Sequence, residues 1–198
     1  MRNIIIYLIL FIFGITTNLM PQQFDWAKCF EGNYVYAYGV AKDNSGNNFV
    51  VGCFDDYLSI DGHLINSLGN TDMFIAKIDK SGNCLWVKGA GGSSVDVAKD
   101  VTVDIHGNIY ITGYFGNNVF IAKYSNDGSF LWVKQSAGIG AGKGEKIKII
   151  SIEKIIITGT YMAPISFGTL ILSSGSGFED CFFVAMDSSG NFSWAERI

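Results

Sequence analysis

Several residue types that would indicate other classes of protein are scarce in this chain. It has only 2 Pro, 4 Cys and 2 His, and Asp, Glu, Lys and Arg together make up 16% of the residues. Because this low charge accompanies 48% hydrophobic residues, the composition argues against a disordered chain. The net charge of −4, with Lys scattered rather than clustered, argues against nucleic acid or an anionic membrane as a partner. What is present, including 24 Gly, is typical of an all-β globular protein.

Long apolar runs are scarce as well, and the main one lies at the N-terminus. It extends from Ile4 to Ile15 and follows the positive charge of Arg2. A membrane-spanning helix needs about 20 apolar residues, so this run is too short for one but suits the core of a signal peptide. We therefore expect residues 1–20 to form an export signal and the mature chain to begin near Pro21. A retained membrane anchor is the alternative.

The strongest feature of the sequence is a stretch that occurs three times. Residues 72–88 read DMFIAKIDKSGNCLWVK, residues 118–134 read NVFIAKYSNDGSFLWVK, and residues 180–196 read DCFFVAMDSSGNFSWAE. Two short apolar runs joined by Asp, Ser, Asn and Gly predict a β-hairpin. In each copy a Gly precedes a Trp by four residues, which places the Trp on the same face of each returning strand. The pairs are Gly82 and Trp86, Gly128 and Trp132, and Gly190 and Trp194.

A second hairpin alternates with the first. Residues 43–52 match residues 104–113, and residues 150–159 are a weaker copy that has lost the Gly-Asn turn. These copies end at Gly52, Gly113 and Gly159, and each period then holds about four strands. The variable spacing between units predicts that Asp55–Thr71 and Tyr161–Glu179 are hairpin insertions on one face. Phe24–Phe30, which carries Trp26, corresponds to the outer strand that closes a unit.

These motifs resemble the SBBP β-propeller repeat of exported bacterial proteins. Residues 104–113 (DIHGNIYITG) and residues 72–86 (DMFIAKIDKSGNCLW) follow the order of its pattern. Phe167-Gly168 and Ser174-Gly175 match its optional insertion, whereas Asn118 and Ser125 stand where the pattern has Asp. The resemblance covers about residues 24–198. It implies four-stranded antiparallel blades arranged around an axis, and it implies no catalytic residue.

The sequence thus predicts an all-β fold, a β-propeller with about three blades at approximately residues 24–86, 87–132 and 133–198. Strands such as NIYITG are apolar on both faces, as sheets require when each is sandwiched between neighbours. The regularly placed Trp are expected to pack between adjacent blades. Because propellers typically close with about four to eight blades, we expect an open or incomplete array. Such an array is either part of a longer propeller or completes itself by self-association.

Two sequence patterns imitate ligand-binding motifs. Gly138–Lys146, GIGAGKGEK, resembles a phosphate loop, but Ala137 and Gly144 stand where such a loop needs Gly and Ser or Thr. We interpret it as a flexible connection between blades. The D-x-S-G-N turns have one Asp before the Gly, whereas a calcium loop needs several oxygen ligands at alternate positions. We interpret them as turns.

The Cys have two readings. Cys29, Cys53, Cys84 and Cys181 occupy unrelated positions of the repeat. In an exported protein they could form disulfides, but a disulfide framework usually shows regular placement. The interpretation that we favour is single buried thiols used as small apolar residues. No C-x-x-C pair occurs, which argues against structural zinc.

We interpret the chain as a non-enzymatic module of a secreted, periplasmic or cell-surface protein that serves as a binding or structural scaffold. No catalytic, cofactor-binding or metal residue is expected. The expected partners are an unidentified protein or glycan ligand and further propeller blades, in the same chain or in a second copy. No membrane span is expected after removal of the signal. Tyr34, Tyr36 and Tyr57 lie outside the best-matching repeat and are candidates for lining a binding face.

The alternative is a quinoprotein-like enzyme domain, because its repeat also places Gly four residues before Trp. In that repeat Asp precedes the Gly by four residues, whereas Asp79 precedes Gly82 by three.

The N-terminal pattern gives the first prediction. Mass spectrometry of the secreted protein should find its N-terminus near residues 17–23, because export signals are removed after their apolar core. An intact Met1 in a soluble cytoplasmic fraction would contradict it.

Overall fold

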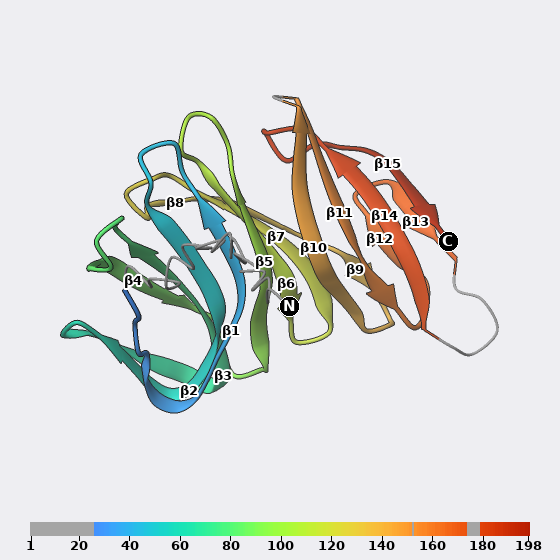
Figure 1. The fold of residues 1–198 in the computed structure, drawn as a ribbon. Coiled ribbons are helices and arrows are strands. Elements are labelled where there is room, and N and C mark those ends of the chain that lie inside the picture. Colours follow the sequence, from blue (N-terminus) through green and yellow to red (C-terminus); the bar gives the residue numbers. More distant parts are fainter. Residues whose placement is uncertain (1–25, 152, 174–178) are drawn as a thin grey trace, which may run out of the picture.

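The structure, a computed structural model, describes residues 26–151, 153–173 and 179–198. The regular elements of these residues are β-strands, which form three four-stranded sheets and one three-stranded sheet. The three larger sheets follow one another along the chain as blades of an open array (Figure 1). The predicted all-β fold of about three four-stranded antiparallel blades is confirmed. The predicted export signal lies outside the described residues.

The first blade is an antiparallel meander in which consecutive strands pair. Its strands are β1 (Glu31–Lys42), β2 (Asn48–Ile60), β3 (His63–Ile78) and β4 (Cys84–Ala90). The predicted hairpin insertion at residues 55–71 is an extension of β2 and β3, paired from Tyr57 with Asn66 to the turn at Asp61 and Gly62.

The second blade is a meander with no insertion. Its strands are β5 (Asp96–Val103), β6 (Ile109–Phe115), β7 (Asn118–Tyr124) and β8 (Phe130–Gln135). Both predicted hairpins are present, with their turns at residues 104–108 and 125–129.

The third blade consists of β10 (Gly142–Ser151), β11 (Lys154–Tyr161), β14 (Asp180–Met186) and β15 (Phe192–Arg197), paired in that order. The weaker repeat copy at residues 150–159 therefore still forms a hairpin without its Gly-Asn turn.

A small sheet accompanies the third blade. It consists of β13 (Leu170–Leu172), β12 (Ile165–Phe167) and β9 (Ala137–Gly138). The hairpin β12–β13 confirms the predicted second insertion over its described residues. The Phe167 ring lies 5.1 Å from the Phe182 ring, so this insertion packs on the blade.

One glycine in each blade is required by a close approach of two strands. A Cβ on Gly52, Gly113 or Gly159 would lie 1.8, 1.9 or 2.0 Å from a carbonyl oxygen of the first strand. No other residue fits there without moving the strand. Next to each of these contacts the first strand carries one unpaired extra residue, a β-bulge, at Tyr38, Lys99 and Glu145 respectively.

The three bulge residues contact one another from blade to blade. The Lys99 ammonium lies 4.4 Å from the centre of the Tyr38 ring and 3.9 Å from the Glu145 carboxylate. The first strands β1, β5 and β10 are therefore adjacent and line the inner side of the arc.

Much of the core lies in the seams between blades. Val51, Met73 and Ile75 of the first blade are buried against second-blade residues such as Ile109 and Phe120. In the second seam, Tyr110, Val119 and Ile121 of the second blade are buried against Ile155 and Ile157 of the third. We call the face that a blade turns toward the next blade in the chain its leading face.

Residues 26–30 cover the other face of the first blade. Trp26 and Phe30 pack on a cluster that includes Phe54 and Phe74. These residues form no strand, so the prediction that this segment is the outer strand of a blade is wrong for its described part. It has no partner strand in the described chain, and the packing of these two rings holds it against the blade.

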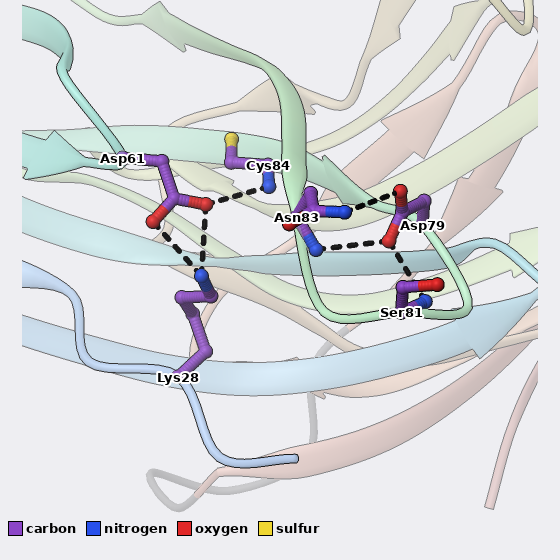
Figure 2. Close-up of polar contacts among 6 residues, drawn as sticks. All are labelled: Lys28, Asp61, Asp79, Ser81, Asn83 and Cys84. Carbon is purple, nitrogen blue, oxygen red and sulfur yellow. Dashed lines mark hydrogen bonds and ion pairs between the residues drawn. The ribbon is translucent and has the colours of Figure 1, made fainter. Parts of the chain in front are cut away.

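Ion pairing also fixes this segment. The Lys28 ammonium donates to both oxygens of Asp61 at 2.8 Å, and the Cys84 amide donates to the same carboxylate at 2.8 Å (Figure 2). The Cys84 hydrogen bond, followed by that of Lys28, lowers the pKa of the Asp61 carboxyl. Asp61 thereby joins the tip of the insertion to both the N-terminal segment and β4.

Two other predictions need correction. Gly142–Lys146 of the glycine-rich stretch belong to β10 and pair with β11, so this part is not a flexible connection. Close contacts leave no room for a side chain at Gly144, because a Cβ there would lie 2.1 Å from Thr112 Oγ1 of the second blade. The prediction of buried thiols holds for Cys53 and Cys84, whereas Cys29 and Cys181 are exposed.

The outer-strand Trp rings lie on the hairpin turns of the next blade. A Cβ on Gly128 would be 3.2 Å from Trp86, and one on Gly190 would be 3.6 Å from Trp132. Trp26 lies in the same way on Gly82, at 2.8 Å. The Trp of one unit thus covers the turn glycine of the following unit.

This contact predicts a stability difference among the Trp. Trp86→Ala should lower the free energy of unfolding by about 3 kcal/mol, the lower end for aromatic truncations because the ring is half-buried. Trp194→Ala is the matched control and should cost less than half as much, because no described glycine has Trp194 among its nearest neighbours. Chemical denaturation measures both. Equal losses would contradict the seam placement.

Candidate binding groove

The aspartates of the repeat turns accept hydrogen bonds from residues of the same turn. Asp79 Oδ1 accepts hydrogen bonds from the amides of Ser81 (2.8 Å) and Asn83 (2.9 Å), and its Oδ2 accepts one from the Asn83 side chain at 2.9 Å (Figure 2). The same three bonds recur at Asp43, Asp104 and Asp187. The Asn83 side chain contributes most to lowering the pKa of the Asp79 carboxyl. Each carboxylate thus fixes its own turn.

Among the described residues, no group of three or more His, Cys, Asp or Glu is placed to hold a metal ion.

We call the turn between the third and fourth strands of a blade its outer turn, and the turn between the first and second strands its inner turn. The carbonyl of the second residue of each outer turn accepts a hydrogen bond from the preceding unit. The Lys80 carbonyl accepts one from Trp26 Nε1 at 3.2 Å. The Asn126 carbonyl accepts one from Lys77 Nζ at 3.2 Å, and the Ser188 carbonyl accepts one from Lys123 Nζ at 3.0 Å. Lys77 and Lys123 occupy the same position of β3 and β7. We call these contacts the latches of the seams.

In the first seam the side chain of Asn126 fills the space around the latch. Its Oδ1 accepts a second hydrogen bond from Lys77 Nζ. Its Nδ2 donates to Asp43 Oδ2 at 3.3 Å and to the Gly107 carbonyl at 3.4 Å. One amide therefore joins the outer turn of the second blade to the inner turns of both blades.

In the second seam the same turn position is Ser188, and a groove of about 700 Å³ lies beside the latch. This volume is within the range of about 300–1,000 Å³ typical of small-molecule sites. The groove lies between the tips of the hairpins β5–β6 and β10–β11, which stand at the same end of the array (Figure 1). Its lining residues are Asp104, Ile105, His106, Asn108, Tyr110, Lys123, Ile149, Ile150, Ser151, Glu153, Ile155 and Ser188.

Charges of both signs line this groove. The Tyr110 hydroxyl donates to Asp104 Oδ2 at 3.2 Å, and the Lys123 ammonium lies 4.9 Å from the centre of the Tyr110 ring. Burial first, and then the charge of Asp104, raise the pKa of Tyr110, which therefore stays protonated. Burial alone would raise the pKa of Asp104, but the hydrogen bonds from Asn108, His106 and Tyr110 together lower it. Asp104 is thus an anion and Tyr110 a neutral donor at neutral pH.

The residues singled out from the sequence lie outside this groove. Trp26, Trp86 and Trp132 cover turn glycines, Trp194 lies on the third blade, and the six predicted glycines lie in turns and strands; none of these residues lines the groove. Tyr34, Tyr36 and Tyr57 are exposed, and the Tyr36 ring stacks on the Tyr38 ring with centroids 6.2 Å apart. Sequence reasoning missed the groove, because Asn126 and Ser188 are both ordinary turn residues and only the contacts across the seam distinguish them.

The fold and its seams define a propeller-type array of repeated blades. A family model described as SBBP, beta-propeller repeat, matches residues 85–121. Residues 85–121 therefore match a β-propeller repeat, which confirms the resemblance seen in the motifs over this part of the chain. The matched residues extend from β4 into β7 and so cross the first seam. A search of curated proteins found no match.

The turn carboxylates predict a pH dependence. Asp104→Asn should lower the free energy of unfolding by about 1–2 kcal/mol at pH 7, because it replaces an acceptor that Asn108 and Tyr110 both use. The folded-state pKa lies below the unfolded value of about 3.9. The contribution of the carboxylate is therefore present above that pH and lost as the pH falls through the folded-state pKa.

Urea denaturation at pH 7 and near pH 3 measures this effect. The difference between Asp104→Asn and the unchanged protein should shrink at the lower pH. Asp56→Asn, at an exposed aspartate outside the turns, is the control and should cost less than about 0.5 kcal/mol at either pH. A difference that does not depend on pH would contradict the role given to the Asp104 carboxylate.

Proposed function

We propose that this protein is a non-enzymatic β-propeller module of an exported or cell-surface protein, and that it serves as a binding or structural scaffold. The observation that carries the proposal is the repeated seam, in which a Trp, a latch and an apolar face hold each unit against the next. The basic and apolar start of the chain supports export. The groove beside Ser188 supports binding.

The leading face of the third blade is the surface on which a further blade would pack. Thr158, Cys181 and Phe183 occupy the positions that Val51, Met73 and Ile75 hold in the first blade. In the first blade these residues are buried in the seam, whereas Cys181 and Phe183 are exposed. Exposed apolar surface that continues an established interface favours association. The partner on this face is another four-stranded blade, in the same polypeptide or in a second copy.

Analytical ultracentrifugation of the processed protein tests this role. Association is expected: a clean dimer supports assembly from two copies, and polydisperse material supports a missing blade in the same polypeptide. Phe183→Lys should leave the protein folded and shift it toward monomer, because it places a charge on the leading face. Leu85→Lys, at an exposed apolar residue of β4, is the control and should not change the distribution.

Two results would contradict the proposal. A stable, cooperatively unfolding monomer of the unchanged protein would remove the scaffold role. A specific absorbance change of the purified protein with pyrroloquinoline quinone and calcium would favour the quinoprotein-like enzyme instead.

A further inference from the structure

The two seams differ in the number of hydrogen-bond acceptors that they provide for the latch lysine. Lys77 Nζ donates to two acceptors of Asn126, its carbonyl and its side-chain oxygen. Lys123 Nζ donates to one acceptor, the carbonyl of Ser188, and lines the groove. An ammonium group has three N–H donors. A partly buried ammonium with one protein acceptor favours a further acceptor beside it.

The groove also contains two carboxylates, those of Asp104 and Glu153. Both oxygens of Asp104 already accept hydrogen bonds from the turn and from the Tyr110 hydroxyl, so Asp104 adds negative charge but no open acceptor. The Glu153 carboxylate can accept a further hydrogen bond. A second anion is disfavoured beside these two carboxylates, and a cation is disfavoured beside Lys123. A neutral group that accepts from Lys123 and donates to Glu153 satisfies both.

The rest of the lining is apolar. Ile155 is buried at the base of the seam, and Ile149 and Ile150 come from the end of β10. An apolar stem packs against these side chains, whereas a fully polar ligand would leave them against water.

We propose that the groove beside Ser188 binds a primary carboxamide carried on an apolar stem, and that the ligand supplies the acceptor that the Asn126 side chain supplies to Lys77 in the first seam. Its oxygen accepts from Lys123, its NH₂ donates to Glu153, and its stem lies on Ile149 and Ile155. Ser188 keeps the site open because its side chain is too short to fill the space that an Asn occupies. This inference rests on the proposed role as a binding module.

The experiment uses hexanamide as the probe and follows backbone amide signals of the full protein by NMR. Hexanamide should shift the signals of Asp104 and Ser188 with roughly millimolar affinity, as befits a ligand of this size. Hexanoate, hexylamine and hexan-1-ol keep the stem but change the head group. Each should bind at least about fivefold more weakly, because hexanoate and hexylamine add a charge and hexan-1-ol has only one oxygen, which cannot reach Lys123 and Glu153 at the same time.

Two variants test the residues. Ser188→Asn fills the site with the amide found at Asn126 and should weaken hexanamide binding at least about tenfold while the protein stays folded. Lys123→Met keeps the stem and removes the ammonium, and it should weaken binding similarly. Lys80→Asn is the matched control, because it introduces the same residue at the same turn position of the first blade. It should leave the affinity unchanged.

The source of the carboxamide is tested with N-acetyl-leucyl-glutamine methylamide. Tighter binding of this blocked peptide than of hexanamide assigns the site to a glutamine side chain of a protein, and weaker binding assigns it to a small free amide.

Absence of shifts up to the solubility of hexanamide would overturn the proposal, as would equal binding of hexan-1-ol or of hexanamide to Ser188→Asn. These results would leave the association of the third blade, and hence the scaffold role, unaffected.

Discussion

The carbonyl of the second residue of each outer turn accepts a hydrogen bond from the preceding unit, and this bond fixes the position of one unit against the next. The buried seam side chains dominate the energy, because each contributes about 1.5–3 kcal/mol and several line every seam. Apolar packing is non-directional, however, and would tolerate a shift along the strands. Lys77 and Lys123 donate to one defined carbonyl each, and the Trp rings cover the adjacent glycines. The latch therefore sets the register, and the apolar seam supplies most of the stability.

Much of the fold was predictable because each blade repeats the same local rules. Gly52, Gly113 and Gly159 recur in the sequence because a first-strand carbonyl approaches each of them too closely for a side chain. The start of β10 was not predictable from local rules, because Gly142–Lys146 has neither β-branched residues nor alternation. Its strand depends on pairing with β11 and on contact with Thr112 of the neighbouring blade, and neither is visible in a short window.

The groove could not be predicted for a related reason. Asn and Ser are both good turn residues, so Asn126 and Ser188 look equivalent when each turn is judged alone. The difference appears only across the seam, where the Asn126 amide reaches Asp43, Gly107 and Lys77 at once. A single substitution that is neutral for the turn removes this bridge. The groove thus lies beside a turn at which one copy of the repeat has Ser188 where the other has Asn126, although both residues suit the turn.

The leading face of the third blade shows a second departure of this kind. Its residue at the position of Lys77 and Lys123 is Ala185, so no latch lysine extends from it. The Lys154 ammonium instead lies 5.7 Å from the centre of the Trp194 ring of the same blade. A blade seated on this face would therefore lack a charged hydrogen bond of the kind worth about 1.5–3 kcal/mol elsewhere. Since about 1.4 kcal/mol is a factor of ten, such a seam would hold its partner at least about tenfold more weakly than the other two. Of the contacts between blades, one made through this face is accordingly expected to dissociate first.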